Sequence, residues 1–278
     1  MFCQRGVSRF EMSRRRFRST PESIARRIAE GRGQGTGGTY RPWHEVQDFP
    51  SSGVSHRLLG LKTERVHHLF SDLELTVFLI YDVLTRIIDI REQFPLLPLD
   101  ETLEIAKKIG VKHPSDPATG YPIVMTTDFL LKLRAKREII FHARTAKYRK
   151  DLDDPRVREK FEIERRYWLR RDIDWGYVTE EDVPSTLSEN AALIHPCYFP
   201  TDLLPLTERD VRKIGFYLAG KVRREESPLS EVVNDSDRKF ELHPGKSFSV
   251  VCHLIGRGNW QVDLLKPISM SERLVLLQ

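Results

Sequence analysis

The chain has 278 residues, more than one domain usually holds, which favours two domains. Its net charge of +5, from 45 Lys and Arg against 40 Asp and Glu, permits nucleic-acid binding without requiring it. No run of 18 or more apolar residues occurs, which argues against a membrane span, and the N-terminus lacks the apolar segment of a secretion signal. Cys3, Cys197 and Cys252 are too far apart for a zinc motif, and they fit a reducing cytoplasm.

The N-terminal region begins with a basic, aperiodic stretch. Residues 1–19 predict a flexible arm, or extra sequence ahead of a start at Met12. Thr20 and Pro21 then have the residue types of an N-cap and a first helical position, so a helix begins there. The glycine-rich stretch GRGQGTGGTY follows. It is either a plain flexible loop or a loop that brings backbone N–H groups and Arg32 close to a phosphate.

A basic segment precedes an acidic helix. The segment SGVSHRLLGLKTERVHHLF contains His56, Arg57, Lys62, Arg65 and His67. These side chains form either a solvated hairpin or a phosphate-contacting flank to a metal site. The next helix is predicted from Ser71 to about Thr85. Glu74 in its first turn fits an S-x-x-E capping box with Ser71, a purely structural alternative to a catalytic role.

The segment RIIDIREQFPLLP reads as a strand closed by prolines, and a β-hairpin is predicted next, with strands over 123–133 and 138–145. Asp128 interrupts the first strand. His142 and Arg144 share one face of the second, since strand side chains alternate. A turn of odd length would bring Asp128 opposite His142, whereas a turn of even length would send them to opposite faces. Their separation of 14 is compatible with the first case.

The remaining pattern predicts two domains. A helix from 155 to about 171 and a short strand over 175–179 complete an α/β domain, a mixed sheet with flanking helices. Beyond about residue 180, three helical patterns precede two β runs, KSFSVVCHLI and NWQVDLLK, which together suggest a winged-helix domain. The predicted boundaries are an arm over 1–19, the α/β domain over 20–180 and the winged-helix-like domain over 181–278.

Glu74, Asp128, His142 and Arg144 together suggest hydrolysis of a phosphodiester. Carboxylates that converge on one point bind Mg²⁺ or Mn²⁺ through oxygen, and such a metal lowers the pKa of a bound water. A neighbouring cation then stabilises the charge that develops on the phosphate. The usual pattern for this chemistry is E…D…[E/Q]-x-K, and here the last part reads His142-Ala143-Arg144.

Several motifs give this reading a family. ARRIAEGRGQG, PSSG-x-SHR, KT-x-RVHHL-x-SDLE, DIREQFPLLP, TDFL and ERRYW occur in one order over about residues 20–180. In them the chain resembles TnsA, the endonuclease subunit of heteromeric bacterial transposases. The resemblance implies a restriction-endonuclease-like domain that cuts the 5′ ends of the transposon, while a DDE transposase, TnsB, cuts the 3′ ends. An AAA+ ATPase, TnsC, regulates both, and the last 100 residues match less closely.

By this resemblance Glu74 and Asp128 are the catalytic carboxylates and metal ligands, and Mg²⁺ or Mn²⁺ is the cofactor. His142 and Arg144 depart from the family pattern of Gln or Glu and Lys. His142 would complete the metal shell and favour Mn²⁺, and Arg144 would hold the phosphate without acting as a base. The expected partners are transposon-end DNA, TnsB and TnsC, in the bacterial cytoplasm. The alternative is a degenerate nuclease fold that only binds DNA and bridges its partners.

Overall fold

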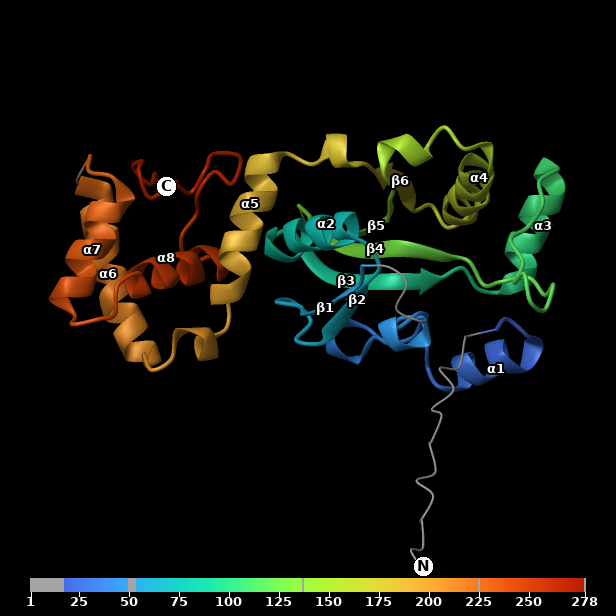
Figure 1. Ribbon diagram of the computed structural model, residues 1–278, viewed down its shortest axis with the longest axis horizontal. Helices are drawn as coiled ribbons and strands as arrows, with labels where there is room; N and C mark the ends of the chain where they lie inside the picture. The colour runs from blue at the N-terminus through green and yellow to red at the C-terminus, as the bar shows by residue number, and fades with distance from the viewer. Residues whose placement is uncertain (1–17, 50–53, 137, 225, 278) are drawn as a thin grey trace, which may run out of the picture.

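A computed structural model of the chain describes residues 18–49, 54–136, 138–224 and 226–277 (Figure 1). The predicted arm therefore lies outside the described residues, except for its last two positions. The elements are α1 (Pro21–Ala29), β1 (His56–Leu59), β2 (Val66–Leu69), α2 (Asp72–Val83), β3 (Ile87–Pro95), α3 (Leu99–Ile109), β4 (Thr126–Ala135), β5 (Glu138–Ala146), α4 (Pro155–Leu169), β6 (Asp174–Val178), α5 (Ser185–Ile194), α6 (Glu208–Arg224), α7 (Leu229–Lys239) and α8 (Lys246–Gly256). None of the helices in these ranges has the length and apolar character needed to cross a membrane.

The centre of the molecule is a mixed sheet in the order β3-β4-β5-β6. The first two pairings are antiparallel and β5 pairs with β6 in parallel. A parallel pair needs a crossover connection, and α4 supplies it between β5 and β6. The strands β1 and β2 form a separate antiparallel pair. The predicted mixed sheet with flanking helices is confirmed.

Helices cover both faces of this sheet because β4 buries side chains on both sides. Phe129 and Leu131 belong to one apolar cluster with Phe78 of α2. Leu130 belongs to a second cluster, with Trp168 of α4 and residues of α3. A strand that is apolar on both faces is typical of a central strand between two layers. The first turn of α2 and the end of β5 therefore lie beside β4, which is packed on both faces.

The register of the β4–β5 hairpin answers the question that the sequence left open. Ala135 pairs with Glu138, so the turn holds two residues, an even number. In this register Leu131 lies opposite His142 and Phe129 lies opposite Arg144. The alternative in which Asp128 lies opposite His142 is therefore excluded. Beyond the last of these pairs, the Ala146 N–H donates to the Asp128 carboxylate, so the end of β5 reaches Asp128.

In the C-terminal lobe, residues 181–224 and 226–277, the regular elements are helices, with α5 to α8 the longest of them. The predicted helices there are confirmed, but the predicted terminal hairpin is wrong: residues 246–255 lie within α8, and no strand forms over 259–266. Val250, Val251 and Ile255 of α8 are buried at helical spacing. A short apolar run does not distinguish a strand from a buried helix, which explains the error. A winged-helix architecture is not confirmed.

The two lobes share α2. Ile80 and Val83, on the side of α2 away from the sheet, belong to one buried cluster with Ala191 and Ile194 of α5. Asp82 adds a polar contact to the C-terminal lobe, because its carboxylate lies 3.4 Å from His195 Nε2. Figure 1 shows α5 between α2 and the remaining C-terminal helices. The helix that carries Glu74 is therefore held from both lobes.

Candidate nuclease site

Glu74 is fixed by the start of α2. The Ser71 hydroxyl caps the helix by accepting from the Glu74 N–H at 3.0 Å. The Glu74 carboxylate accepts from the Phe70 N–H at 3.0 Å and from the Gln93 amide at 3.4 Å, and it is 8% exposed. A reciprocal capping box would return the carboxylate to the Ser71 N–H. The carboxylate instead accepts from the N–H of Phe70, the residue before Ser71, and from Gln93 of β3. Its contacts therefore extend beyond those of a capping box.

We expect Ser71→Ala to lower the free energy of unfolding by about 1 kcal/mol, because the N–H of Glu74 loses its capping acceptor. Urea unfolding followed by circular dichroism measures this change. Ser188→Ala is the matched control, since the Ser188 hydroxyl is exposed and only donates to the Ser185 carbonyl within its own helix. Equal effects of the two substitutions would contradict a capping role.

Asp128 lies on β4 close to the end of β5. Its Oδ2 accepts a hydrogen bond from the Ala146 N–H at 2.9 Å. Burial raises the pKa of Asp128 well above its usual range, and the charges of Glu74 and Glu164 raise it further. Burial likewise raises the pKa of Glu74 to about 7, against the hydrogen bonds that it accepts. The two carboxyls therefore lack enough nearby positive charge to offset burial and, at Asp128, the charge of Glu74.

This donor set fits a hard divalent cation. Within the described residues no group of three or more His, Cys, Asp or Glu side chains is arranged to hold a metal by itself. Mg²⁺ is commonly held by one or two carboxylates, with waters and substrate phosphate completing its shell. Glu74 and Asp128 match that arrangement, because a cation between them would stabilise the ionised form of both.

Lys147 is the cation next to this pair; the sequence interpretation considered it as an alternative cation, outside the motif position. It follows the last residue of β5, and its charge acts to lower the pKa of Asp128. Its ammonium group pairs with Asp151 at 3.2 Å. Thr145-Ala146-Lys147 is a polar-x-Lys triplet three residues after the predicted position, with Thr145 where the family pattern has Glu or Gln. Its lysine was a signal in the sequence that could have marked it.

His142 and Arg144 lie elsewhere, around Asp174 of β6. Arg144 Nη1 donates to the Asp174 carbonyl at 3.0 Å, and its Nη2 pairs with the Asp174 carboxylate. His142 Nδ1 is 3.3 Å from Arg144 Nη2, and burial followed by the Arg144 charge lowers the pKa of His142. The structure does not join this group to Glu74 and Asp128 as predicted. The register places it opposite Phe129 and Leu131 instead.

Glu164 of α4 is a further acid that the sequence interpretation missed. Its Oε1 accepts from the hydroxyls of Thr127 and Thr145, each at 2.6 Å, and its side chain is 3% exposed. Burial raises the pKa of Glu164. Its charge also acts on Asp128, so it belongs to the same acidic site. Its place in the ERRYW motif was a signal that could have marked it.

Three of the predicted DNA contacts are internal. Arg65 donates to the Glu92 carboxylate at 2.8 and 2.5 Å, and His67 Nδ1 is 2.8 Å from it. Arg32 is 9% exposed and pairs with Asp48 at 2.9 Å. These predictions are corrected because each of the three side chains contacts a nearby acid inside the fold.

The other three predicted contacts are at least partly exposed. His56 pairs with Asp72 at 2.8 Å, and Arg57 is exposed on β1. Lys62 is half-buried, and burial lowers its pKa. The strands β1 and β2 do form the hairpin that was one of the two alternatives, but its inward side chains are buried rather than solvated.

The mixed sheet, its flanking helices and the carboxylate pair fit a restriction-endonuclease-like fold. Two family models match consecutive parts of the chain: "TnsA-like endonuclease N terminal" over residues 85–180 and "TnsA endonuclease C terminal" over residues 182–264. A similar protein is "Transposon Tn7 transposition protein TnsA" of Escherichia coli, 50% identical over 167 residues. That match covers 60% of this chain and spans 60% of the relative's length. The chain belongs to the TnsA family.

Proposed function

We propose that this chain is the endonuclease subunit of a heteromeric transposase and hydrolyses the phosphodiester at the 5′ ends of the transposon with Mg²⁺ or Mn²⁺. The observation that carries the proposal is the pair of buried Glu74 and half-buried Asp128, whose pKa values are both raised and which lies beside Lys147. Transposon-end DNA, a TnsB-like transposase and a TnsC-like ATPase are the partners that the family suggests, in the bacterial cytoplasm.

The protein's own residues would divide the work. Glu74 and Asp128 would hold the metal, whose chemistry is to lower the pKa of a bound water and to neutralise charge on the phosphate. The Phe70 and Ala146 N–H groups fix the orientation of the two carboxylates. Lys147 would stabilise charge that develops on the phosphate oxygens, or pass a proton to the leaving group. Specificity for the transposon end would come mainly from the partners.

The position of Lys147 weakens the alternative of a degenerate nuclease. That alternative was motivated by His142 and Arg144 standing where the family has Gln or Glu and Lys. A lysine beside Asp128 removes this motive, because the cation that the chemistry needs is available from another position.

Strand-specific nicking of labelled transposon-end DNA tests the proposal. The chain would be mixed with its TnsB-like and TnsC-like partners in Mg²⁺, in Mn²⁺ and in EDTA. We expect cutting at the 5′ ends in either metal, and none in EDTA or with Asp128→Ala. Cutting at the 3′ ends should persist in the Asp128→Ala mixture. Absence of 5′ cutting by the wild-type chain in both metals, with 3′ cutting present, would refute the nuclease.

A further inference from the structure

The C-terminal lobe carries a groove that the nuclease site does not use. It has a volume of about 640 Å³ and lies along the second half of α6 and the end of α7. Lys213, Lys221, Arg223, Arg224 and Lys239 line it, together with the rings of Phe216, Tyr217 and Phe240. Among the described residues that line it, none is acidic. A groove with five cations and no lining acid is complementary to a polyanion.

Lysine ammonium groups in this groove lie close to its aromatic rings. Tyr217 and Phe240 meet edge to face with centroids 5.5 Å apart. Lys239 lies 4.7 Å from the Tyr217 centroid and Lys213 lies 5.6 Å from the Phe240 centroid. Asp235, at the border, pairs with Lys221 at 3.2 Å and accepts from the Tyr217 hydroxyl. This packing holds the rings of Tyr217 and Phe240 in place, with the ammonium groups of Lys213 and Lys239 beside them.

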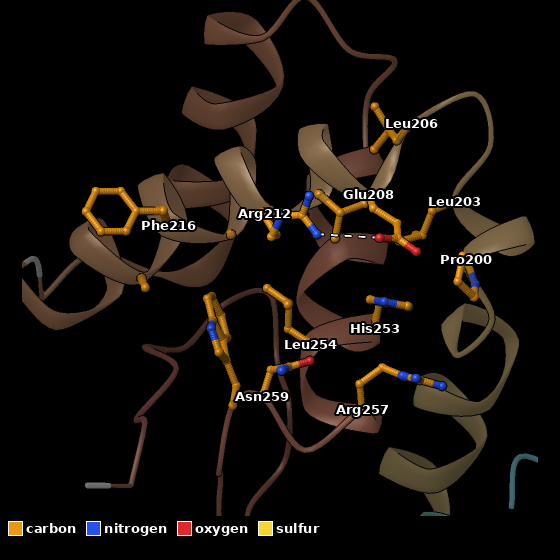
Figure 2. A pocket seen from close by; sticks show the side chains of 14 residues that line it. Pro200, Leu203, Leu206, Glu208, Arg212, Phe216, His253, Leu254, Arg257 and Asn259 are labelled. Atoms are coloured by element: carbon orange, nitrogen blue, oxygen red, sulfur yellow. Dashed lines mark hydrogen bonds and ion pairs between the residues drawn. The ribbon is translucent and has the colours of Figure 1, made fainter.

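Phe216 is the exposed member of the set. Its side chain is 86% exposed, the highest value among the large apolar residues described. Figure 2 views the neighbouring pocket on α6 and shows Phe216 apart from the rest of that pocket's side chains. That pocket contains a carboxylate, since Glu208 pairs with Arg212 at 3.4 Å. Of these two neighbouring pockets, only the groove on the Lys213 side of Phe216 has no carboxylate among its lining residues.

We infer that this groove binds a single strand of DNA, with phosphates on the cations and an unpaired base stacked on Phe216. Single-stranded nucleic acid is held by a basic groove combined with exposed aromatic rings. A duplex hides the faces of its bases, so it would leave Phe216 unused. The inference rests on the proposed function in one respect, because that function is the reason for taking DNA as the polyanion that binds here.

Fluorescence anisotropy with a labelled 20-nucleotide single strand and its duplex, in EDTA, tests the inference with the full chain. The groove variant is Lys213→Gln/Arg223→Gln/Lys239→Gln. The control is Lys107→Gln/Lys108→Gln/Lys112→Gln, which removes the same charge from exposed positions on and just after α3. We expect the groove variant to lower the slope of log affinity against log salt by about 2, at ~0.7 per phosphate contact. Phe216→Ala should weaken single-strand binding about tenfold and leave duplex binding unchanged.

Equal behaviour of the groove variant and its control would overturn the inference. So would unchanged single-strand binding by Phe216→Ala. The triple glutamine variant and Phe216→Ala could both bind DNA normally but lose affinity for an acidic amphipathic peptide. The groove would then be a protein-docking surface, and the inference would fail. Binding in EDTA is independent of cleavage. A wild-type chain that never nicks DNA, yet binds a single strand through Phe216, would refute the proposed function and leave this inference standing.

Discussion

Replacing Lys147 by alanine is expected to lower the rate of 5′ cleavage by about 10³-fold, the usual cost of losing a group that stabilises developing charge or transfers a proton. Its charge acts on Asp128, and no other Lys or Arg is among the main influences on the pKa of Asp128. Single-turnover nicking of transposon-end DNA at saturating partner concentration measures this rate directly. Arg144→Ala should retain the rate within a few-fold, because Arg144 pairs with Asp174 instead.

A larger loss of activity in Arg144→Ala than in Lys147→Ala would identify Arg144 as the catalytic cation. If Arg144→Ala abolished nicking and Lys147→Ala did not, His142-Ala143-Arg144 would be the functional triplet despite its position. Lys147→Arg separates the two possible roles of the lysine. A guanidinium keeps the charge but stays protonated, so substantial activity would indicate charge stabilisation, and loss would indicate proton transfer.

The sequence was sufficient for the parts of the site that depend on local patterns. A serine followed three residues later by glutamate, ahead of an apolar stripe, located the start of α2 and the position of Glu74. Apolar runs on either side of a basic turn located β4 and β5 and put Asp128 on a strand. Each of these signals lies within about ten residues, where helix and strand periodicities act directly.

The parts that failed depend on relations between distant residues. The turn between Ala135 and Glu138 contains no glycine or asparagine to reveal its length, and a change of one residue exchanges the faces of β5. Because of that single unknown, the sequence could not show that His142 and Arg144 lie opposite Leu131 and Phe129 rather than beside Asp128. The partners of Arg65 and His67 lie 25 to 27 residues away, at Glu92 on β3, so nothing local showed that these cations face inward.

The Glu92→Gln substitution is expected to lower the free energy of unfolding at pH 7 by about 3–5 kcal/mol, the cost of leaving one partner of a buried ion pair uncompensated. Glu92 is fully buried and accepts from Arg65, from His67 and, at 3.3 Å, from the His68 N–H. The amide is nearly isosteric, so the change removes charge and acceptor capacity rather than volume. Glu104→Gln is the control, because its pair with Lys108 is mostly exposed and a pair of this kind contributes little to stability.

The pH dependence of the difference in unfolding free energy between wild type and Glu92→Gln identifies the cause of that difference. Burial acts to raise the pKa of Glu92, but the His67 charge and the hydrogen bonds from Arg65 and His67 outweigh it and hold that pKa well below 4.5. A carboxyl with a lowered folded-state pKa stabilises above its unfolded value and loses that contribution as pH falls. The gap between wild type and Glu92→Gln should therefore narrow as the pH falls below about 4.5, in urea unfolding at pH 7 and pH 3. A gap that stays constant would mean that the substitution acts through packing, and that the charge of Glu92 contributes little to holding β2 against β3.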